Sequence, residues 1–120
     1  MMPWTSLRVP ASSANLGPGF DALGLALSLY LECRFRQSRQ LSIEAEGRDA
    51  SAISTGEDNL IWQTALAVAA DVGAPLPAVD LEIDNDIPIG KGLGSSAAAL
   101  TAGVVIADQI LGLHWKPLQS

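Results

Sequence analysis

Cysteine, histidine and basic residues are all scarce in this sequence, and each scarcity excludes a class of protein. The 120 residues include one Cys and one His, so no disulfide can form within the chain and the disulfide-stapled secreted class is excluded. Seven Lys and Arg stand against 13 Asp and Glu, which gives a net charge of −6. This balance argues against binding to nucleic acid or to an anionic membrane, since both attract cationic surfaces.

Long apolar runs are missing as well. The longest, residues 97–107, is too short to span a bilayer. The first residues do not show the basic segment and apolar segment of a secretory signal peptide. With 48% hydrophobic and 17% charged residues, the chain is nevertheless too apolar to be disordered. We therefore expect one globular, cytoplasmic domain over residues 1–120, with neither a nucleic acid nor a membrane as its partner.

Alternating apolar and polar residues predict the strands. The alternation is clearest over residues 29–36, and residues 41–45 continue it after a polar turn, so we expect these two segments to form a hairpin. Residues 79–84 predict a third strand. A short first strand is expected around Leu7 to Val9, ended by Pro10.

The polar faces of two of these strands carry opposite charges. One strand carries alternating carboxylates, and the other carries the alternating Arg34 and Arg36. The carboxylates are those of Asp80, Glu82, Asp84 and Asp86. No histidine or opposing ligand pattern accompanies the carboxylates, so we interpret their face as solvated rather than as a metal site. The two arginines are candidate cross-strand partners of the acidic residues.

Two helices are predicted. Residues 56–59 offer cap residues and first-turn acids, and apolar residues then recur at helical spacing over residues 61–72, before a stop signal at Gly73. A second helix is expected over residues 95–111, with Gly112 at its end. It is apolar on nearly every side, as a helix buried in a domain interior would be. The mixed order of strands and helices favours an α+β fold over a doubly wound sheet.

The most informative stretch is residues 88–98, which reads P-I-G-K-G-L-G-S-S-A-A and is called the glycine-rich segment below. Gly90, Gly92 and Gly94 let a ligand approach the backbone N–H groups closely. Ser95 and Ser96 follow where the helix begins, and a helix N-terminus supplies free donors and a partial positive charge. These features predict an anion site suited to phosphate. The alternative is a flexible turn capped by one of the two serines.

This segment matches neither common nucleotide motif. Ser95 stands where the Walker A pattern requires lysine after its last glycine, and the glycines alternate rather than follow the dinucleotide fingerprint.

A second unusual stretch covers residues 10–21. Gly17-Pro18-Gly19 predicts a sharp turn, with Asn15 and Asp21 on either side of it. An amide and a carboxylate on an ordered loop could bind an amino or hydroxyl group through directed hydrogen bonds. The alternative is that both side chains only cap the turn.

Both stretches resemble signatures of one family. The glycine-rich segment resembles the phosphate-binding signature of the GHMP kinases, small-molecule kinases unrelated to the P-loop enzymes. The string N-L-G-P-G-F-D at residues 15–21, continuing into residues 23–27, resembles the N-terminal signature of the homoserine kinases within that family. The resemblance implies an α+β two-layer fold shared with the second domain of ribosomal protein S5. Residues 1–120 would form its N-terminal ATP-binding domain.

The resemblance also implies the site residues. Asn15 and Asp21 match positions at the homoserine site, and Asn59 lies in a string, residues 58–61, that matches positions near the adenine pocket. We assign no catalytic residue, and we expect a Ser95 or Ser96 hydroxyl near Mg²⁺, with Ser96 as the assigned ligand. The implied nucleotide-binding residues are Pro88, Ile89, Gly90, Lys91, Gly92, Leu93, Gly94, Ser95, Ser96, Ala97, Ala98 and Asn59.

The implied reaction moves the γ-phosphoryl group of ATP to the side-chain hydroxyl of L-homoserine, a step toward threonine, with ATP and Mg²⁺ as cofactors. The alternatives are another GHMP kinase acting on mevalonate, a sugar or shikimate, and a non-catalytic module of the same fold. A homodimer is a further expectation. Family members are longer, with a later glutamate that helps to hold Mg²⁺ and a C-terminal domain. We therefore expect the 120 residues to be an N-terminal portion that is inactive by itself.

Overall fold

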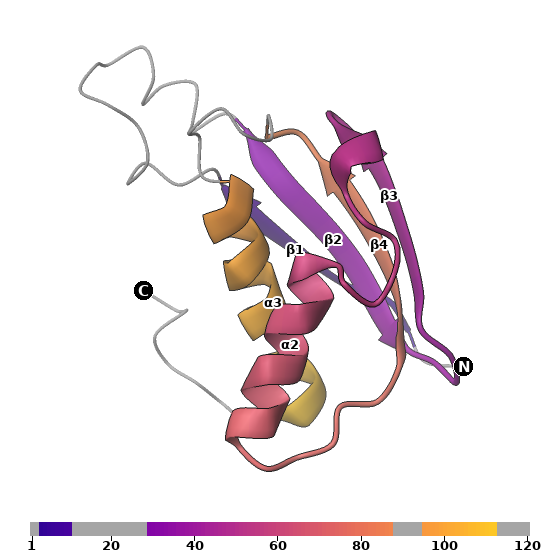
Figure 1. Ribbon diagram of the computed structural model, residues 1–120, viewed down its shortest axis with the longest axis vertical. Helices are drawn as coiled ribbons and strands as arrows, with labels where there is room; N and C mark the ends of the chain where they lie inside the picture. The colour runs from indigo at the N-terminus through magenta and orange to yellow at the C-terminus, as the bar shows by residue number, and fades with distance from the viewer. Residues whose placement is uncertain (1–2, 11–28, 88–94, 113–120) are drawn as a thin grey trace, which may run out of the picture.

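The computed structural model describes residues 3–10, 29–87 and 95–112. Their elements in chain order are β1 (Thr5–Pro10), β2 (Tyr30–Gln37), β3 (Ser42–Gly47), the short 3-10 helix η2 (Ala50–Ala52), α2 (Leu60–Asp71), β4 (Val79–Asn85) and α3 (Ser95–Leu111). The described strands form a four-stranded sheet in the order β1-β2-β4-β3, and both helices pack side by side against one of its faces (Figure 1). The α+β class is confirmed.

All four predicted strands are present, but the predicted hairpin is wrong. β2 pairs antiparallel with β1 and with β4, whereas β3 pairs parallel with β4 and does not pair with β2. The last strand of the four in sequence therefore lies between two strands that are neighbours in sequence.

Burial explains why β4 takes the central place. Val79, Leu81 and Ile83 are at most 1% exposed, whereas β3 buries only Ile43 completely enough to join the core. A strand in the middle of a sheet is shielded by a strand on each side, so the most regularly apolar strand gains most from that position. The hairpin prediction relied on proximity in sequence, which cannot show this competition.

The two helices begin and end close to the predicted residues. The Asn59 side chain caps the start of α2, and Gly73 follows its end with φ +71°. Gly112, with φ +66°, follows the end of α3. Positive φ is accessible to glycine without strain, which is why glycine ends both helices.

The core lies between the helices and the inner face of the sheet. Its least exposed large side chains come from β2 and β4, from Ile87 and from α3, where Ile106 is 1% exposed. Cys33 of β2 is also 1% exposed, and burial raises the pKa of its thiol from 9.0 to about 12. The thiol is therefore a neutral core group rather than a reactive one.

Helix α3 is less buried than its composition predicts. Small residues let it approach α2 closely: a Cβ on Gly103 would lie 2.5 Å from Thr64 Cβ and 2.6 Å from the Ile61 carbonyl oxygen. On another side of the helix, Leu100 is 46% exposed. Within the described residues, the sheet and α2 therefore cover only part of α3, a helix that is apolar on nearly every side.

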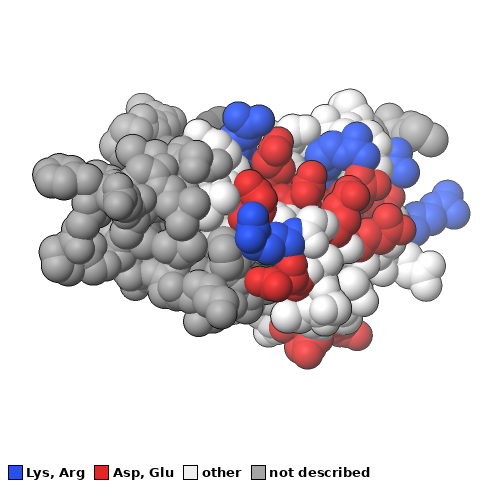
Figure 2. Space-filling view, turned by 90° about the horizontal axis from the view of Figure 1, so that it is seen from above, with Lys and Arg blue, Asp and Glu red and all other residues white. Residues whose placement is uncertain are grey.

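The outer face of the sheet carries paired charges. Arg34 pairs with Glu82, and Arg36 Nε lies 2.9 Å from Asp80 Oδ2, so the predicted cross-strand partners are confirmed. The Trp4 ring stacks on both arginines, with centroid distances of 4.8 and 4.3 Å. Figure 2 shows basic and acidic side chains side by side on the described surface. In the described ranges, neither helix has both the length and the apolar character needed to cross a bilayer.

Candidate functional site

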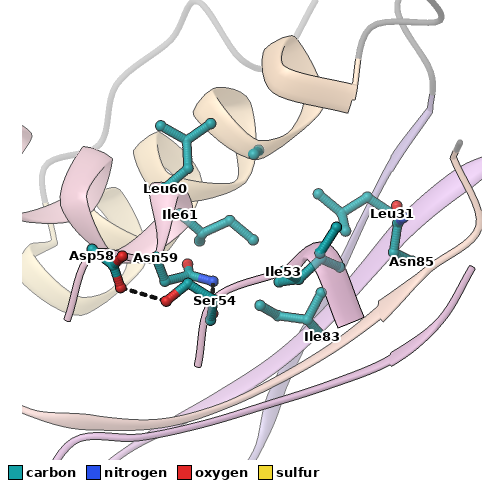
Figure 3. Close-up of a pocket in the computed structure, with 11 residues that line it drawn as sticks. Leu31, Ile53, Ser54, Asp58, Asn59, Leu60, Ile61, Ile83 and Asn85 are labelled. Carbon is teal, nitrogen blue, oxygen red and sulfur yellow. Dashed lines mark hydrogen bonds between the residues drawn. The ribbon is translucent and has the colours of Figure 1, made fainter. Parts of the chain in front are cut away.

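A cavity of about 260 Å³ opens between the sheet, the start of α2 and the early part of α3 (Figure 3). Its walls are mainly apolar and include Leu31 and Ile83 from the sheet, Ile53 from the segment after η2, and Leu60 and Ile61 from α2. Small-molecule sites are typically concave and apolar with a few placed polar groups. This cavity has that character.

Most of the polar groups that line the cavity gather at the start of α2. Asn59 is 3% exposed, and its Oδ1 accepts a hydrogen bond from the Trp62 backbone N–H at 3.1 Å. Its Nδ2 donates to the Ser54 carbonyl oxygen at 2.7 Å. The side chain thus caps α2 and ties the helix to the segment that follows η2.

Ser54 and Asp58 hold the same corner. The Ser54 hydroxyl donates to Asp58 Oδ1 and accepts from the Gly56 N–H at 3.1 Å. In Figure 3 these two side chains lie beside Asn59 at the rim of the cavity. The corner is therefore rigid, and the Asp58 carboxylate, on an exposed residue, gives its rim a negative charge.

Helix α3 brings its first turns to the cavity. Ala99 lines the wall, and α3 begins four residues earlier at Ser95, about 6 Å along the helix axis. The first four N–H groups of a helix have no acceptor within it, so residues 95–98 offer donors close to an apolar cavity. A ligand with an apolar ring and an anionic tail fits this combination of groups.

The structure places only some of the predicted site residues. Asn59 lies at the cavity, while Ala97 is half-buried and Ala98, in the core, is 1% exposed. Asn15, Asp21 and residues 88–94 lie outside the described residues, as do the side chains of Ser95 and Ser96. Among the residues that are described, no group of three side chains is gathered to hold a metal ion.

Sequence reasoning missed Asn85, which also lines the cavity. It is 4% exposed and closes β4 on the inner face, where the three preceding inward residues are apolar. A feature of the sequence that could have pointed to Asn85 is its polar side chain at the fourth inward position of an alternating strand, two residues before Ile87.

The comparisons with known proteins agree with the fold. Residues 59–119 match the family described as "GHMP kinases N terminal domain", so the match begins at the cap of α2 and includes the glycine-rich segment and α3. The chain belongs to the GHMP kinase family.

Within that family, the chain is similar to proteins named homoserine kinase. One from Solibacter usitatus is 68% identical over 116 residues, which cover 97% of this chain and 38% of that protein. One from Bacillus pumilus is 49% identical over 109 residues, covering 91% of this chain and 35% of the relative. The solved structure of a putative homoserine kinase from Listeria monocytogenes aligns with a TM-score of 0.71 at 36% identity, over 95% of this chain and 39% of that one. The chain thus spans well under half the length of these relatives.

Proposed function

We propose that this chain is the N-terminal ATP-binding domain, residues 1–120, of a homoserine kinase, which transfers the γ-phosphoryl group of ATP to the side-chain hydroxyl of L-homoserine. The observation that carries the proposal is the apolar cavity beside the start of α3, directly after the glycine-rich segment. Supporting it are the N-L-G-P-G-F-D string and the similarity to relatives named homoserine kinase.

In this proposal the cavity takes the adenine ring. Leu31, Ile53, Leu60 and Ile61 supply apolar surface for it, while the α2 cap at Asn59 holds the rim in place. The triphosphate then extends toward the first turn of α3, where free backbone N–H groups and the helix dipole stabilise negative charge. Residues 88–98 supply further backbone N–H groups to the phosphates.

Phosphoryl transfer depends mainly on positioning and on neutralising charge. Mg²⁺, when bound, neutralises charge on the phosphates, and a serine hydroxyl with a carboxylate suits it because Mg²⁺ prefers oxygen ligands. Ser96 would hold it together with a glutamate that the family resemblance places beyond these residues. Asn15 and Asp21 would bind the amino acid, and no residue is assigned as a general base.

A chimera tests the proposed function. The 116 aligned residues of the Solibacter usitatus protein are replaced by those of this chain, so that the remainder of a full-length relative is present. We expect ATP-dependent formation of phosphohomoserine, with little ADP release when mevalonate, a sugar or shikimate replaces homoserine. Turnover of one of those alcohols instead, with the unmodified relative active on homoserine in the same assay, would contradict the proposal.

The same chimera tests the amino-acid site. Asn15→Ala and Asp21→Ala each remove a hydrogen bond to a charged or hydroxyl group of the substrate, which costs about 1.5–3 kcal/mol, or roughly 10- to 150-fold in affinity. The loss of affinity should appear as a higher KM for homoserine, while KM for ATP stays nearly unchanged. Ser13→Ala is the neighbouring control. Equal losses for both substrates would mean that the two side chains only shape a turn.

Homodimer formation and a cytoplasmic location stay predictions. Light scattering on the purified chimera tests the first, and fractionation of the source cells tests the second.

A further inference from the structure

The end of β4 is held from two sides by a group of residues that the proposed function does not use. The group consists of Gly47, Arg48, Asn85, Asp86 and Ile87, and we call it the β4 clamp. It lies where the chain leaves the sheet, immediately before Pro88 and the glycine-rich segment.

Asn85 forms the inner side of the clamp. Its Oδ1 accepts from the Ile87 N–H at 3.1 Å, and its Nδ2 donates to the Ile87 carbonyl oxygen at 2.8 Å. One side chain therefore holds both backbone polar groups of Ile87, whose own side chain is 0% exposed. The second Nδ2 hydrogen reaches the Arg48 carbonyl oxygen at 2.9 Å. Both N–H donors of the Asn85 side-chain amide are thus used within the protein.

Arg48 forms the outer side. Its backbone N–H donates to the Asn85 carbonyl oxygen at 2.6 Å, and its Nε donates to the Asp86 carbonyl oxygen at 3.1 Å. The preceding Gly47 has φ +92°, and a Cβ there would lie 2.3 Å from the Asn85 carbonyl oxygen. Only glycine allows the two backbones to come this close.

The clamp lies beside the cavity, which Asn85 itself lines. Arg48 leads through η2 to Ile53 and Ser54, which line the cavity, and Ile87 leads directly into the glycine-rich segment. A shift of Ile87 would change where the chain leaves the sheet beside the cavity. Buried amide groups with all of their partners resist such a shift, because moving them leaves backbone groups without hydrogen bonds.

We propose that Asn85 is a positioning residue for nucleotide binding: through its bonds to Ile87 and Arg48 it sets where the chain enters the glycine-rich segment relative to the cavity. This inference rests on the proposed function. Asn85 also lines the cavity, but both of its Nδ2–H donors are used within the protein, so its positioning effect acts through the backbone of Ile87 and Arg48.

Asn85→Asp is the sharpest substitution. It has the same shape and can still accept from the Ile87 N–H, but it loses both donors and places a carboxylate against two carbonyl oxygens. We expect the dissociation constant and KM for Mg·ATP to rise about 10- to 100-fold, as small misplacements of a binding group do. KM for homoserine should change less than about threefold.

Two further variants separate positioning from stability. Val79→Ala lies on the same face of the same strand, at its other end, where the side chain is 0% exposed. It should lower the melting temperature without changing the affinity for ATP. Arg48→Ala, at a half-exposed side chain, removes the outer bond to the Asp86 carbonyl oxygen and the 3.8 Å ion pair with the Asp86 carboxylate. It should weaken ATP binding in the same direction but by less.

The measurements are Mg·ATP titration, steady-state kinetics and thermal melting of the full-length chimera and its variants. Two results would overturn the inference alone. One is an unchanged affinity for ATP in a folded Asn85→Asp protein. The other is a loss of ATP affinity no larger than that of a Val79→Ala protein with the same melting temperature. If Asn85→Asp does not fold, unchanged affinity in Arg48→Ala overturns it. If the unsubstituted chimera does not bind Mg·ATP, the proposed function fails together with the inference.

Discussion

Cys33 links stability to pH at a single buried residue. Burial penalises the thiolate and raises the pKa of this thiol from its ordinary value of 9.0 to about 12 in the folded chain. Above pH 9 the unfolded chain binds fewer protons than the folded chain, so the free energy of unfolding falls as pH rises toward 12.

We therefore predict that urea denaturation of the chain and of Cys33→Ala will give stabilities that converge above about pH 9, the ordinary pKa of the thiol. Below that pH the variant should be less stable, because it leaves a small cavity in the core. Above it, the difference should shrink by up to about 1.4 kcal/mol per pH unit. Comparing the two proteins cancels the titration of the groups they share. A difference that stays constant from about pH 8 to about pH 11 would contradict the prediction.

The site residues show what a sequence reveals at this scale. Asn59 was predictable, because an asparagine before a helical repeat is a recognisable cap, and the structure shows it capping α2. Asn85 was not, since its role depends on Arg48 and Gly47, which lie 37 and 38 positions earlier in the sequence. A local pattern cannot identify a hydrogen bond between strands whose pairing is unknown.

At the scale of elements, the contact between α2 and α3 depends on Gly103. An alanine there would gain about 1 kcal/mol in helix propensity. Its Cβ would, however, lie 2.6 Å from the Ile61 carbonyl oxygen and 2.5 Å from Thr64 Cβ, so the helices would have to move apart.

We predict that Gly103→Ala lowers the free energy of unfolding by about 1–3 kcal/mol, as overpacking usually does. Leu100→Ala is the control on the same helix, because Leu100 is 46% exposed and its truncation should cost far less. Thr64→Ala should not rescue the variant, since the Ile61 carbonyl oxygen stays in place. Chemical denaturation measures all three. A Gly103→Ala protein as stable as the unsubstituted chain would mean that the helices separate without cost.

The order of elements in the sheet marks the limit of local reasoning. Periodicity, caps and glycine stops predicted the four strands and the two α-helices, and the structure places each of them near the predicted residues. The position of β4 between β2 and β3 depends on which strand gains most from central burial. That comparison involves every strand at once. The strand order could therefore be predicted from the sequence only through the resemblance to a known fold.

The whole molecule raises the question of how much chemistry 120 residues can perform. The chain spans 38% of the Solibacter usitatus relative and 39% of the Listeria monocytogenes structure that it resembles. Its described residues supply an apolar cavity and the first turn of α3, and they gather no group of three metal-binding side chains. Under the proposed function, the cavity and the first turn of α3 bind the nucleotide.

We predict that the 120 residues, purified alone, form no phosphohomoserine above background. Without the carboxylate that the family resemblance assigns to Mg²⁺, charge on the transferring phosphoryl group is poorly neutralised, and the rate should fall at least about 10²- to 10³-fold below that of the chimera. Weak Mg·ATP binding should persist, and Asn85→Asp should weaken it. This pair of results would show that the purified chain is folded at the site. Light scattering in the same buffer checks the isolated chain for self-association. Turnover of homoserine by the isolated chain at a rate near that of the chimera would show that the phosphate site and its metal are complete within it.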